Sequence, residues 1–563
     1  MKKITPWIFI IVILIAAFLR FCRLGDVPVG IHRDEAFLGY NAYSILKNGR
    51  DMSGQPWPLH FSSFLYSPGG YAYAAIPPIA LFGLTPFAVR FPSAFFGLLT
   101  VIAVYFLVRE LFREEKYHDA CALFASLSLA LSPWHINLSR TATEHAVAVF
   151  FLIVGLHLFI LWTRKNHAWL LVSAMIALVL PLGIYQAPRS FLPLFIPLLY
   201  YTFRKRIPSW KLPILLYCLF ILLPVVMILF SPKLSLRLRT VSIFSTEETQ
   251  LTVDEQIRED GTREVTPFVS RFFHNKVIAY SFAYLKNYFA HFTYDFLFSD
   301  AASPDRYRVP GMGLLYLADL PLLLMGIGWL IHRRNKEKTL LIGWFILSFA
   351  GSALTFDDIP NLQRTLMVVP VLSIVIAWGA ITAIAYAKGM NQKRLLAFLV
   401  VCAYGLNVLY YLHQYSVHQV VHRPWYRHEG YKELVSTVNS LLPQFSNVVI
   451  TDRESAPTIF FLFYGMYDPA QFQGETSQPS DQSIDRRNFG PYEFTQEECP
   501  MREESVTDKI TGKQSKVVVG EPDILYVNWG GCKLPEKNVR LLDEIKRSDG
   551  TTVFQIASVS PIP

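Results

Sequence analysis

Two adjacent carboxylates, Asp34 and Glu35, stand in a short polar stretch about a dozen residues beyond the first apolar run of the chain, residues 6–21. A carboxylate that is held in place can act as a general base, because it can accept the proton of an attacking hydroxyl group. The alternative is a solvated turn or a helix cap just outside a membrane. The choice depends on the polar residues that other segments bring to the same side.

The composition places the elements that carry these residues in a membrane. Of the 563 residues 52% are hydrophobic, and the mean hydropathy is +0.31. A soluble protein of this length is far less apolar, so we expect a polytopic membrane protein. The net charge of +9 lies mostly in short clusters between apolar runs. Such clusters are typical of topology signals and of contacts with anionic membrane lipids, so we expect no nucleic acid partner.

Eleven apolar runs are expected to form membrane helices. They are residues 5–22, 87–112, 119–133, 144–163, 168–185, 189–203, 211–231, 312–332, 339–355, 364–387 and 394–412. The first run lacks a small-residue cleavage site behind it, so it is expected to remain as a membrane helix. Every second connection is rich in Lys and Arg, which is typical of cytoplasmic loops. This pattern predicts a multi-pass protein of the cell membrane, with its N-terminus in the cytoplasm and its C-terminal tail outside.

Two long loops then lie outside, at residues 23–86 and 232–311. In the first loop, the apolar spacing predicts an interfacial helix over residues 34–47, which ends before Gly49, and a second helix over residues 74–84. The dipole of the first helix would favour the ionised form of Asp34 and Glu35 at its start.

The chain changes character behind the membrane region, which we place at residues 1–415. Residues 416–563 predict a small extracytoplasmic α/β domain, with a helix at 429–442 and strands at 447–452 and 523–528. Residues 470–520 are rich in Gln, Ser, Glu and Lys and are expected to form loops. Cys499 and Cys532 are the only cysteines of the tail, and on an oxidising side they are expected to form a disulfide.

A set of charged residues converges on the expected outer boundary of the membrane. It consists of Asp34, Glu35, Asp51, Arg90, Arg140, Glu144, Arg189, Asp300, Arg306, Arg308 and Arg364. Arginines there can simply extend to the lipid headgroups. They can also hold a phosphate, because a guanidinium group matches two phosphate oxygens. Carboxylates beside a phosphate clamp predict a transferase that uses a lipid-linked phosphate donor, whereas phosphate-binding glycine loops and hydrolase motifs are missing from the sequence.

Several stretches also resemble a known family. They are 30–36 (GIHRDEA), 39–43 (GYNAY), 90–97 (RFPSAFFG), 132–135 (SPWH) and 139–141 (SRT), with Glu144 behind them. These stretches are similar to bacterial members of the protein O-mannosyltransferase group, which are GT-C glycosyltransferases related to the aminoarabinose transferases of lipid A. The resemblance covers roughly residues 1–415 in layout and is most specific in the first 150.

The resemblance implies that Asp34 and Glu35 lie at the catalytic centre and that Arg364 contacts the lipid phosphate. The sequence departs from the pattern of this family in two places. Residues 64–68 read Phe-Leu-Tyr-Ser-Pro where relatives often carry a lysine, and the tail does not resemble the sugar-binding β-trefoil insert of the family.

The expected activity is transfer of a hexose, such as mannose, from a polyprenyl-phosphate donor to an acceptor hydroxyl of a protein, lipid or glycan. Asp34 is the expected base and Glu35 its positioning partner or an acceptor contact. The expected binding residues are His32, Tyr40, Asp51, Glu144 and the three arginines 90, 140 and 364, each as a phosphate or structural contact. No cofactor is required, although a divalent metal could bridge carboxylate and phosphate.

Two other classes of function remain open. A flippase for a lipid-linked sugar would carry internal repeats and charges at mid-membrane depth, and neither pattern is found here. A non-catalytic protein of envelope assembly would explain the tail, but it would leave the acidic and arginine residues without a role.

Overall fold

The chain folds into two compact units, each assembled from separate segments. A computed structural model describes residues 5–62, 67–332, 336–476, 484–507 and 514–559. The first unit comprises residues 1–22, 59–71 and 93–414, and the second comprises residues 23–58, 72–92 and 415–563. The predicted basic residues at 333–334 and the departure at 64–66 lie outside the described part of the chain.

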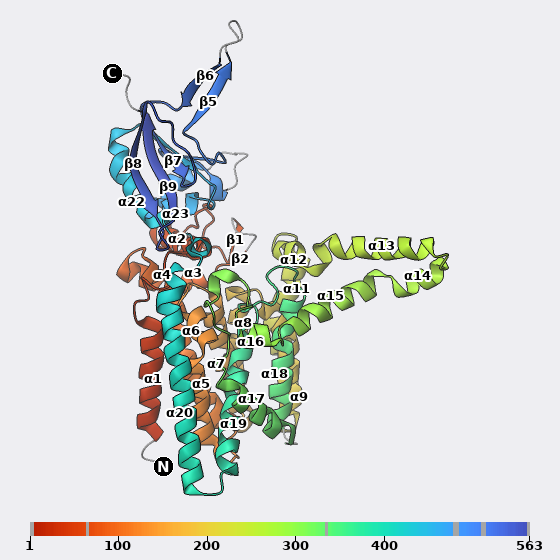
Figure 1. The fold of residues 1–563 in the computed structure, drawn as a ribbon. Helices are drawn as coiled ribbons and strands as arrows, with labels where there is room; N and C mark the ends of the chain where they lie inside the picture. Colours follow the sequence, from red (N-terminus) through yellow and green to blue (C-terminus); the bar gives the residue numbers. More distant parts are fainter. Residues whose placement is uncertain (1–4, 63–66, 333–335, 477–483, 508–513, 560–563) are drawn as a thin grey trace. The chain divides into compact units, whose positions relative to one another are not determined.

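The first unit is a bundle of helices that run side by side (Figure 1). Its helices are α1 (Thr5–Phe21), α4 (Pro86–Leu111, from residue 93 on), α5 (His118–Leu131), α6 (Pro133–Ser139), α7 (Glu144–Lys165), α8 (Ala168–Ile184), α9 (Pro188–Phe203), α10 (Lys211–Tyr217), α11 (Leu223–Phe230), α17 (Asp319–His332), α18 (Lys336–Ala353), α19 (Val369–Tyr386) and α20 (Met390–His413). A helix therefore occupies each of the eleven predicted runs.

Fewer of these helices are long and apolar enough to cross a membrane on their own. Five meet both conditions among the described residues, or six if α5 and α6, which are bent by 58° to one another, form one broken span. Four apolar helices are shorter, so the count of eleven is not confirmed. The run predicted from residue 312 becomes helical only at Asp319, whose carboxylate accepts the backbone N–H of Tyr316 in the preceding turn. The protein is nonetheless a multi-pass membrane protein.

The core of the bundle forms around α19, which packs against α5 and α17. Gly379 of α19 allows the approach of α17, because a Cβ atom at this position would lie 1.8 Å from the Leu322 carbonyl oxygen. Two buried indoles belong to this core. Trp134 donates its Nε1 hydrogen to Leu362, and Trp344 donates to Met367. Buried tryptophans need such partners for their N–H groups.

The long loop at 232–311 is mostly helical and includes an arm that projects from the bundle (Figure 1). The arm is built from α13 (Glu248–Thr262), α14 (Pro267–Phe273) and α15 (Lys276–Ala290), with α12 (Leu236–Val241) before it and α16 (Tyr294–Phe298) after it. The last turn of α15 returns to α18. A two-stranded sheet of β1 (His60–Phe61) and β2 (Ser67–Pro68) belongs to the same unit.

The second unit contains a five-stranded mixed sheet in the order β4-β3-β7-β9-β8. β4 (Tyr492–Thr495), β3 (Asn447–Thr451) and β7 (Ile524–Trp529) are parallel, whereas β9 (Thr552–Val559) and β8 (Val539–Lys546) are antiparallel to their neighbours. With α22 (Tyr431–Leu441), α23 (Thr458–Tyr464) and α24 (Pro469–Glu475), this sheet confirms the predicted α/β fold of the tail.

Two predictions for the tail have different outcomes. The disulfide between Cys499 and Cys532 is confirmed. The prediction of loops over residues 470–520 is wrong, because this region contains the end of α24, β4 and the hairpin of β5 (Arg502–Thr507) and β6 (Gln514–Val519). The polar composition misled the prediction, since short edge strands and exposed hairpins bury few apolar side chains.

The first loop folds together with the tail in the second unit. Its helix α2 (Arg33–Asn48) packs against α23 and α24, which lie more than 400 residues later in the chain. Gly39 makes the approach possible, because a Cβ atom there would lie 2.8 Å from the ring of Phe463. Tyr40 donates a hydrogen bond to the Tyr467 carbonyl, and Gln473 donates one to the Asp51 carbonyl. The described parts of α2 and the tail therefore share one core.

Candidate functional site

Asp34 lies in the first turn of α2, as the sequence predicted, and a capping box fixes this turn. The Nδ1 atom of His32 accepts the backbone N–H of Asp34, and the Glu35 carboxylate accepts the backbone N–H of His32. The Asp34 carboxylate lies 3.4 Å from His32 Nδ1, and its side chain is 28% exposed. The start of α2 thus presents one carboxylate at a surface of the second unit, on a turn that is held from both sides.

Glu35 points the other way and is fully buried beside Arg90. The Arg90 guanidinium donates to both oxygens of the Glu35 carboxylate, at 3.1 Å each. Its remaining N–H groups reach the carbonyl oxygens of Leu24, Pro28 and Gly30. All five N–H donors of Arg90 therefore have acceptors within the second unit, and the Arg90–Glu35 pair holds the first loop in place.

Two further candidates of the first loop lie in the interior of the second unit. Tyr40 and Asp51 are both fully buried. One oxygen of Asp51 accepts the backbone N–H groups of Ser53 and Gln55, which fixes the turn after α2. Burial raises the pKa of the Asp51 carboxyl, and these two N–H groups oppose the shift. In this arrangement both side chains shape the loop.

In the first unit, Arg140 holds the end of α1. It donates to the carbonyl oxygens of Leu19 and Cys22 and is almost completely buried. Arg20, which the sequence analysis did not single out, is fully buried as well and donates to the Leu129 and Ala130 carbonyls. Glu144 is the first residue of α7 and is half-buried. Arginines that donate to several carbonyl oxygens in this way fasten helix ends and leave few donors for a ligand.

Arg364 and Arg189 have a different setting, because both line a cavity of about 340 Å³ in the first unit. Gln186, Ser190 and Thr355 are the polar neighbours of the two arginines in its wall. Tyr185 and Ser235 also line it, and most of the remaining wall is aliphatic and includes Val225, Ile228, Leu229, Leu234, Val241 and Leu354. The cavity thus combines two guanidinium groups with an apolar lining, which suits an amphiphilic anion.

Each of these arginines is held by a neighbour. Arg364 forms an ion pair with Asp357 at 2.9 Å and also donates to the Thr355 hydroxyl. Arg189 donates to the Leu182 carbonyl and to Nε2 of His60, at 2.8 Å. Burial, together with the charge of Arg189, lowers the pKa of His60 to about 4, so His60 is a neutral acceptor at pH 7. No carboxylate pairs with Arg189 among the described residues.

His145 was one of several histidines without an assigned role in the sequence. Its ring lies 3.9 Å from that of Tyr185, which lines the cavity, and the charges of Arg364 and Arg306 act on it. The ring is buried, and neither nitrogen has a hydrogen-bond partner in the described structure. The sequence signal was the position of His145 directly behind Glu144, at the start of a membrane helix.

The remaining charged candidates, Asp300, Arg306 and Arg308, are all in the first unit. Arg308 pairs with Asp300 at 3.0 Å and also with Asp305, and none of these residues lines the cavity. Among the described residues, no group of three or more His, Cys, Asp or Glu side chains is arranged to hold a metal ion.

Comparison with known proteins supports the resemblance seen in the sequence. The family model described as dolichyl-phosphate-mannose-protein mannosyltransferase matches residues 68–235. The comparison with curated proteins found no match.

Among solved structures, the fold is similar to an oligosaccharyltransferase of Archaeoglobus fulgidus, with 15% identity and a TM-score of 0.50. That match covers 81% of this chain and 61% of the archaeal chain, so the protein spans less than two thirds of its length. The fold is also similar to ArnT from Cupriavidus metallidurans, with 11% identity, a TM-score of 0.51 and 98% of each chain covered. The predicted resemblance is therefore confirmed, since the family model matches residues 68–235 and the fold is similar to that of ArnT.

Proposed function

We propose that the protein is a membrane glycosyltransferase that moves a sugar from a polyprenyl-phosphate donor to an acceptor hydroxyl at the outer face of the membrane. The observation that carries the proposal is the cavity in which Arg189 and Arg364 meet an aliphatic wall. A phosphodiester that links a sugar to an isoprenoid chain has the matching features, which are one negative charge and an apolar tail.

The two arginines would have different roles in binding the donor. Arg364 is already paired with Asp357 and would contribute hydrogen bonds to the phosphate, whereas Arg189 has only neutral partners and would supply the compensating charge. Arg189 is half-buried, and a cation that is partly removed from water without a carboxylate is unfavourable, so binding of an anion is favoured there. The same groups would stabilise the phosphate as it leaves, when its charge increases.

Asp34 would act as the general base. Its carboxylate accepts the proton of the acceptor hydroxyl, the hydroxyl oxygen forms a bond with the anomeric carbon, and the bond between that carbon and the phosphate oxygen breaks. The polyprenyl phosphate leaves with the electron pair, and a single displacement of this kind inverts the anomeric centre. Glu35 and Arg90 would keep α2 in position, and neither would touch the substrate.

A transfer assay tests this proposal. The full-length protein in lipid nanodiscs is mixed with membrane extract and with polyprenyl-phosphate donors that carry different radiolabelled sugars. Transfer of label from one of these donors to an acceptor is the expected result. The absence of transfer from every donor, with a folded protein and an active control enzyme in the same extract, would overturn the proposal.

Arg364→Lys tests the phosphate contact. Lysine keeps the charge but loses the planar fork, and a charge-assisted hydrogen bond is worth about 1.5–3 kcal/mol, so donor affinity should fall roughly 10- to 100-fold. The matched control is Arg308→Lys, the same change in an ion-paired arginine outside the cavity lining. Equal losses in the two variants would argue against a phosphate site at Arg364.

The proposed orientation needs its own test. With the exposed cysteines 22, 218 and 402 changed to serine, Gly261→Cys at the tip of the arm and Lys165→Cys at the end of α7 are treated with an impermeant thiol reagent in intact cells. We expect labelling of Gly261→Cys and none of Lys165→Cys. The reverse pattern would place the arm and the cavity on the cytoplasmic side.

A further inference from the structure

The projecting arm hardly buries any of its own side chains. Its helices α13, α14 and α15 have 15, 7 and 15 residues, yet only Val253 and Ser270 among the residues of these helices are buried. Short helices are marginal in water unless one face packs against something. The arm therefore lacks an internal core that could hold it together, and another surface is needed to cover it.

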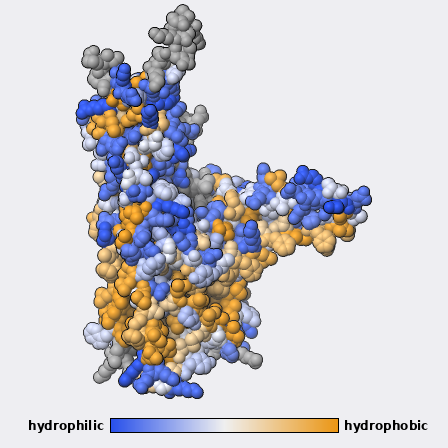
Figure 2. Space-filling view, in the orientation of Figure 1, coloured by the Kyte–Doolittle hydropathy of each residue, from blue (hydrophilic) through white to orange (hydrophobic). Residues whose placement is uncertain are grey.

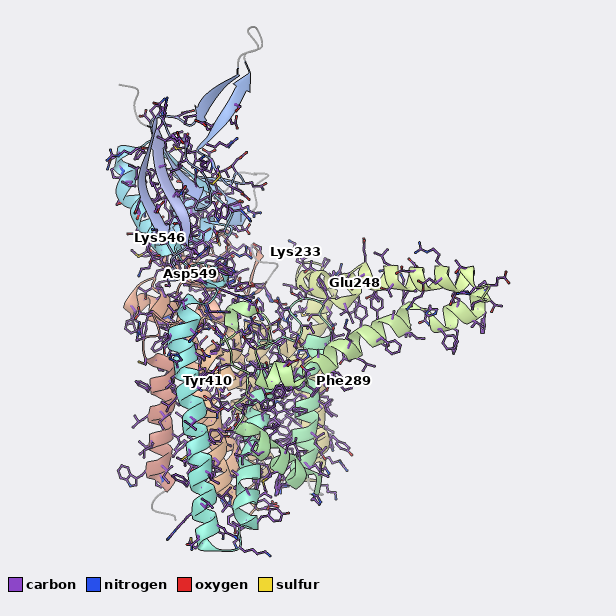
Figure 3. All side chains as sticks on the ribbon, viewed as in Figure 1. Lys233, Glu248, Phe289, Tyr410, Lys546 and Asp549 are labelled. Atoms are coloured by element: carbon purple, nitrogen blue, oxygen red, sulfur yellow. A yellow bond between two sulfur atoms is a disulfide. The ribbon has the colours of Figure 1, made fainter. Side chains whose placement is uncertain are left out.

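The uncovered side chains of α14 and α15 are large and apolar. Phe268 is 81% exposed and Val277 is 76% exposed, and Phe272, Phe282 and Phe289 exceed 60%. Figure 2 shows this surface along one side of the arm, with hydrophilic side chains along the other. Figure 3 labels one residue of each kind, Phe289 on α15 and Glu248 on α13. An apolar face of this extent is rare on a surface that faces water.

Charge is divided between the helices in the same way. Residues 265–294 contain no Asp or Glu, whereas Arg271, Lys276 and Lys286 give α14 and α15 a positive charge. Helix α13 is acidic and carries Glu248, Asp254, Glu255, Glu259 and Asp260. Basic and aromatic residues beside an apolar face are typical of helices that lie in the headgroup region of anionic membranes. Acidic residues would be repelled from the same region, so α13 would face water.

The apolar face begins at the surface of the bundle. The last turn of α15 is held by α18, since Tyr288 donates to the Ile346 carbonyl and His291 bonds to the Ser352 hydroxyl. The Ile346 side chain itself is about half exposed, on a helix predicted to span the membrane. The apolar face of the arm is thus continuous with bundle surface that faces lipid (Figure 2).

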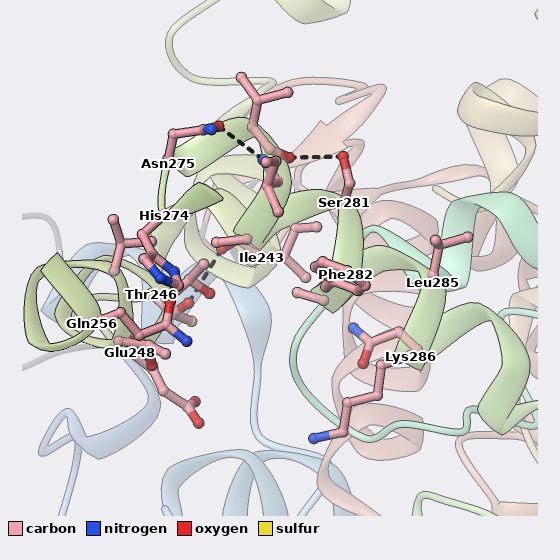
Figure 4. A pocket seen from close by; sticks show the side chains of 18 of the residues that line it. Ile243, Thr246, Glu248, Gln256, His274, Asn275, Ser281, Phe282, Leu285 and Lys286 are labelled. Carbon is pink, nitrogen blue, oxygen red and sulfur yellow. Dashed lines mark hydrogen bonds between the residues drawn. The ribbon is translucent and has the colours of Figure 1, made fainter. Parts of the chain in front are cut away.

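The inner side of the arm is open as well. A groove of about 1020 Å³ separates α13 from α15 (Figure 4), with Val253 and Phe282 among its apolar residues and Gln256 and Lys286 among its polar ones. Near the tip, His274 bonds to Gln256 and lies 3.3 Å from Asp260. Gln250 of α13 also donates to the Tyr280 hydroxyl and accepts from Lys276 of α15, so polar groups link the two helices at more than one place.

We propose that α14 and α15 lie in the lipid interface of the leaflet at this end of the bundle, with their apolar and basic face in the membrane and α13 in the water. A bilayer of anionic phospholipid is the occupant that fits the observations, because it matches the apolar face, the positive charge and the continuity with the bundle together. This inference does not depend on the proposed enzymatic activity.

The test measures where single fluorescent labels lie in proteoliposomes of phosphatidylethanolamine and phosphatidylglycerol. In the full-length protein, with cysteines 22, 218 and 402 changed to serine, Phe272→Cys and Val277→Cys report on the apolar face. Glu255→Cys and Glu259→Cys on α13 are the matched controls. Each variant is labelled with an environment-sensitive dye and is quenched either by lipid-attached nitroxide or by iodide in the water.

Interfacial helices lie about 5–10 Å into the boundary between headgroups and acyl chains. Labels on the apolar face should therefore be quenched by a nitroxide near the headgroup at least about twice as strongly as the α13 labels are. A nitroxide deep in the acyl chain should quench the labels on the apolar face less strongly than a nitroxide near the headgroup does. The α13 labels should respond to iodide. Two outcomes overturn the proposal. Equal iodide quenching on both faces places the arm in water, and protection from both quenchers places the apolar face against protein, such as a second copy of the chain.

Discussion

Arg90 in the second unit and Arg189 in the first are the same residue type at the start of predicted membrane helices, yet their surroundings differ. Arg90 is surrounded by acceptors, and one of them is the carboxylate of Glu35. Arg189 has a carbonyl and a neutral imidazole as partners, and it lines a cavity. The charge of Arg90 is neutralised within the fold, whereas the charge of Arg189 is not. The difference shows that position along a membrane helix does not define a ligand site, and that an uncompensated charge beside a cavity does.

The two carboxylates at the start of α2 differ in their surroundings in the same way. Asp34→Asn tests this difference, and it has the largest expected effect. The change keeps the shape of the side chain but removes the basic oxygen, so turnover should fall by roughly 10²–10⁴. Thermal stability and donor affinity should stay near those of the wild type, because the Asp34 side chain is partly exposed and His32, the cap of the helix, is unchanged. Steady-state kinetics with the labelled donor provide the measurement. Retention of most of the activity would remove Asp34 from the mechanism.

Glu35→Gln should act on folding instead. The change leaves the Arg90 guanidinium buried without its counter-charge, which typically destabilises a protein by about 3–5 kcal/mol. The double variant Glu35→Gln, Arg90→Met removes both charges and should recover part of that loss. Unfolding followed in detergent separates these variants from the wild type. A Glu35→Gln protein of normal stability that cannot turn over would instead give Glu35 a direct role in the reaction.

Arg189→Gln should have the opposite effect, because it should weaken donor binding and leave stability nearly unchanged. Because no carboxylate depends on Arg189, stability should change by less than about 1 kcal/mol, whereas donor affinity should fall roughly tenfold or more. Arg90→Gln is the matched control and should lose stability first. Binding of a fluorescent donor analogue and thermal unfolding of the same samples give both quantities. Similar behaviour of the two glutamine variants would abolish the distinction between the arginines.

The smallest expected effect concerns pH. The pKa of His60 is lowered to about 4, from an ordinary value near 6.5, so the folded protein resists protonation at this site. The stabilisation that His60 provides is therefore complete above about pH 6.5 and is lost as the pH falls through 4. His60→Gln cannot titrate. The difference in melting temperature between wild type and His60→Gln should shrink between pH 7 and pH 4.5, and a constant difference would contradict the neutral acceptor assigned to His60.

Local features of the chain were predictable from the sequence. The helix expected at 34–47 is observed over Arg33–Asn48, because its apolar spacing, its capping residues and Gly49 in the left-handed conformation all act within a few residues. The disulfide was predictable because only two cysteines occur in the tail. The predicted GT-C resemblance also depended on short stretches of sequence.

The sequence did not predict which arginine is neutralised within the fold and which one lines the cavity. Arg90 is neutralised by a carboxylate 55 residues earlier, and Arg189 is held by a histidine 129 residues earlier. Which partner reaches which guanidinium depends on the tertiary fold, so residue type and predicted depth could only name candidates. The cavity is set by tertiary packing in the same way, since its lining comes from segments as far apart as Tyr185 and Arg364. The prediction of loops at 470–520 was wrong for a related reason, because β4 is stabilised by its pairing with β3 about 45 residues earlier.

The shared core of α2 and the tail has a consequence for biosynthesis. The bond between Tyr40 and Tyr467 joins residues that are 427 positions apart. At about 5–20 residues per second, a ribosome needs roughly 20–85 s to reach the second partner after the first. During that interval the loop with Asp34 lacks the surface on which it packs. A nascent chain is therefore expected to remain inactive, and open to proteases and chaperones, until its last hundred residues have emerged.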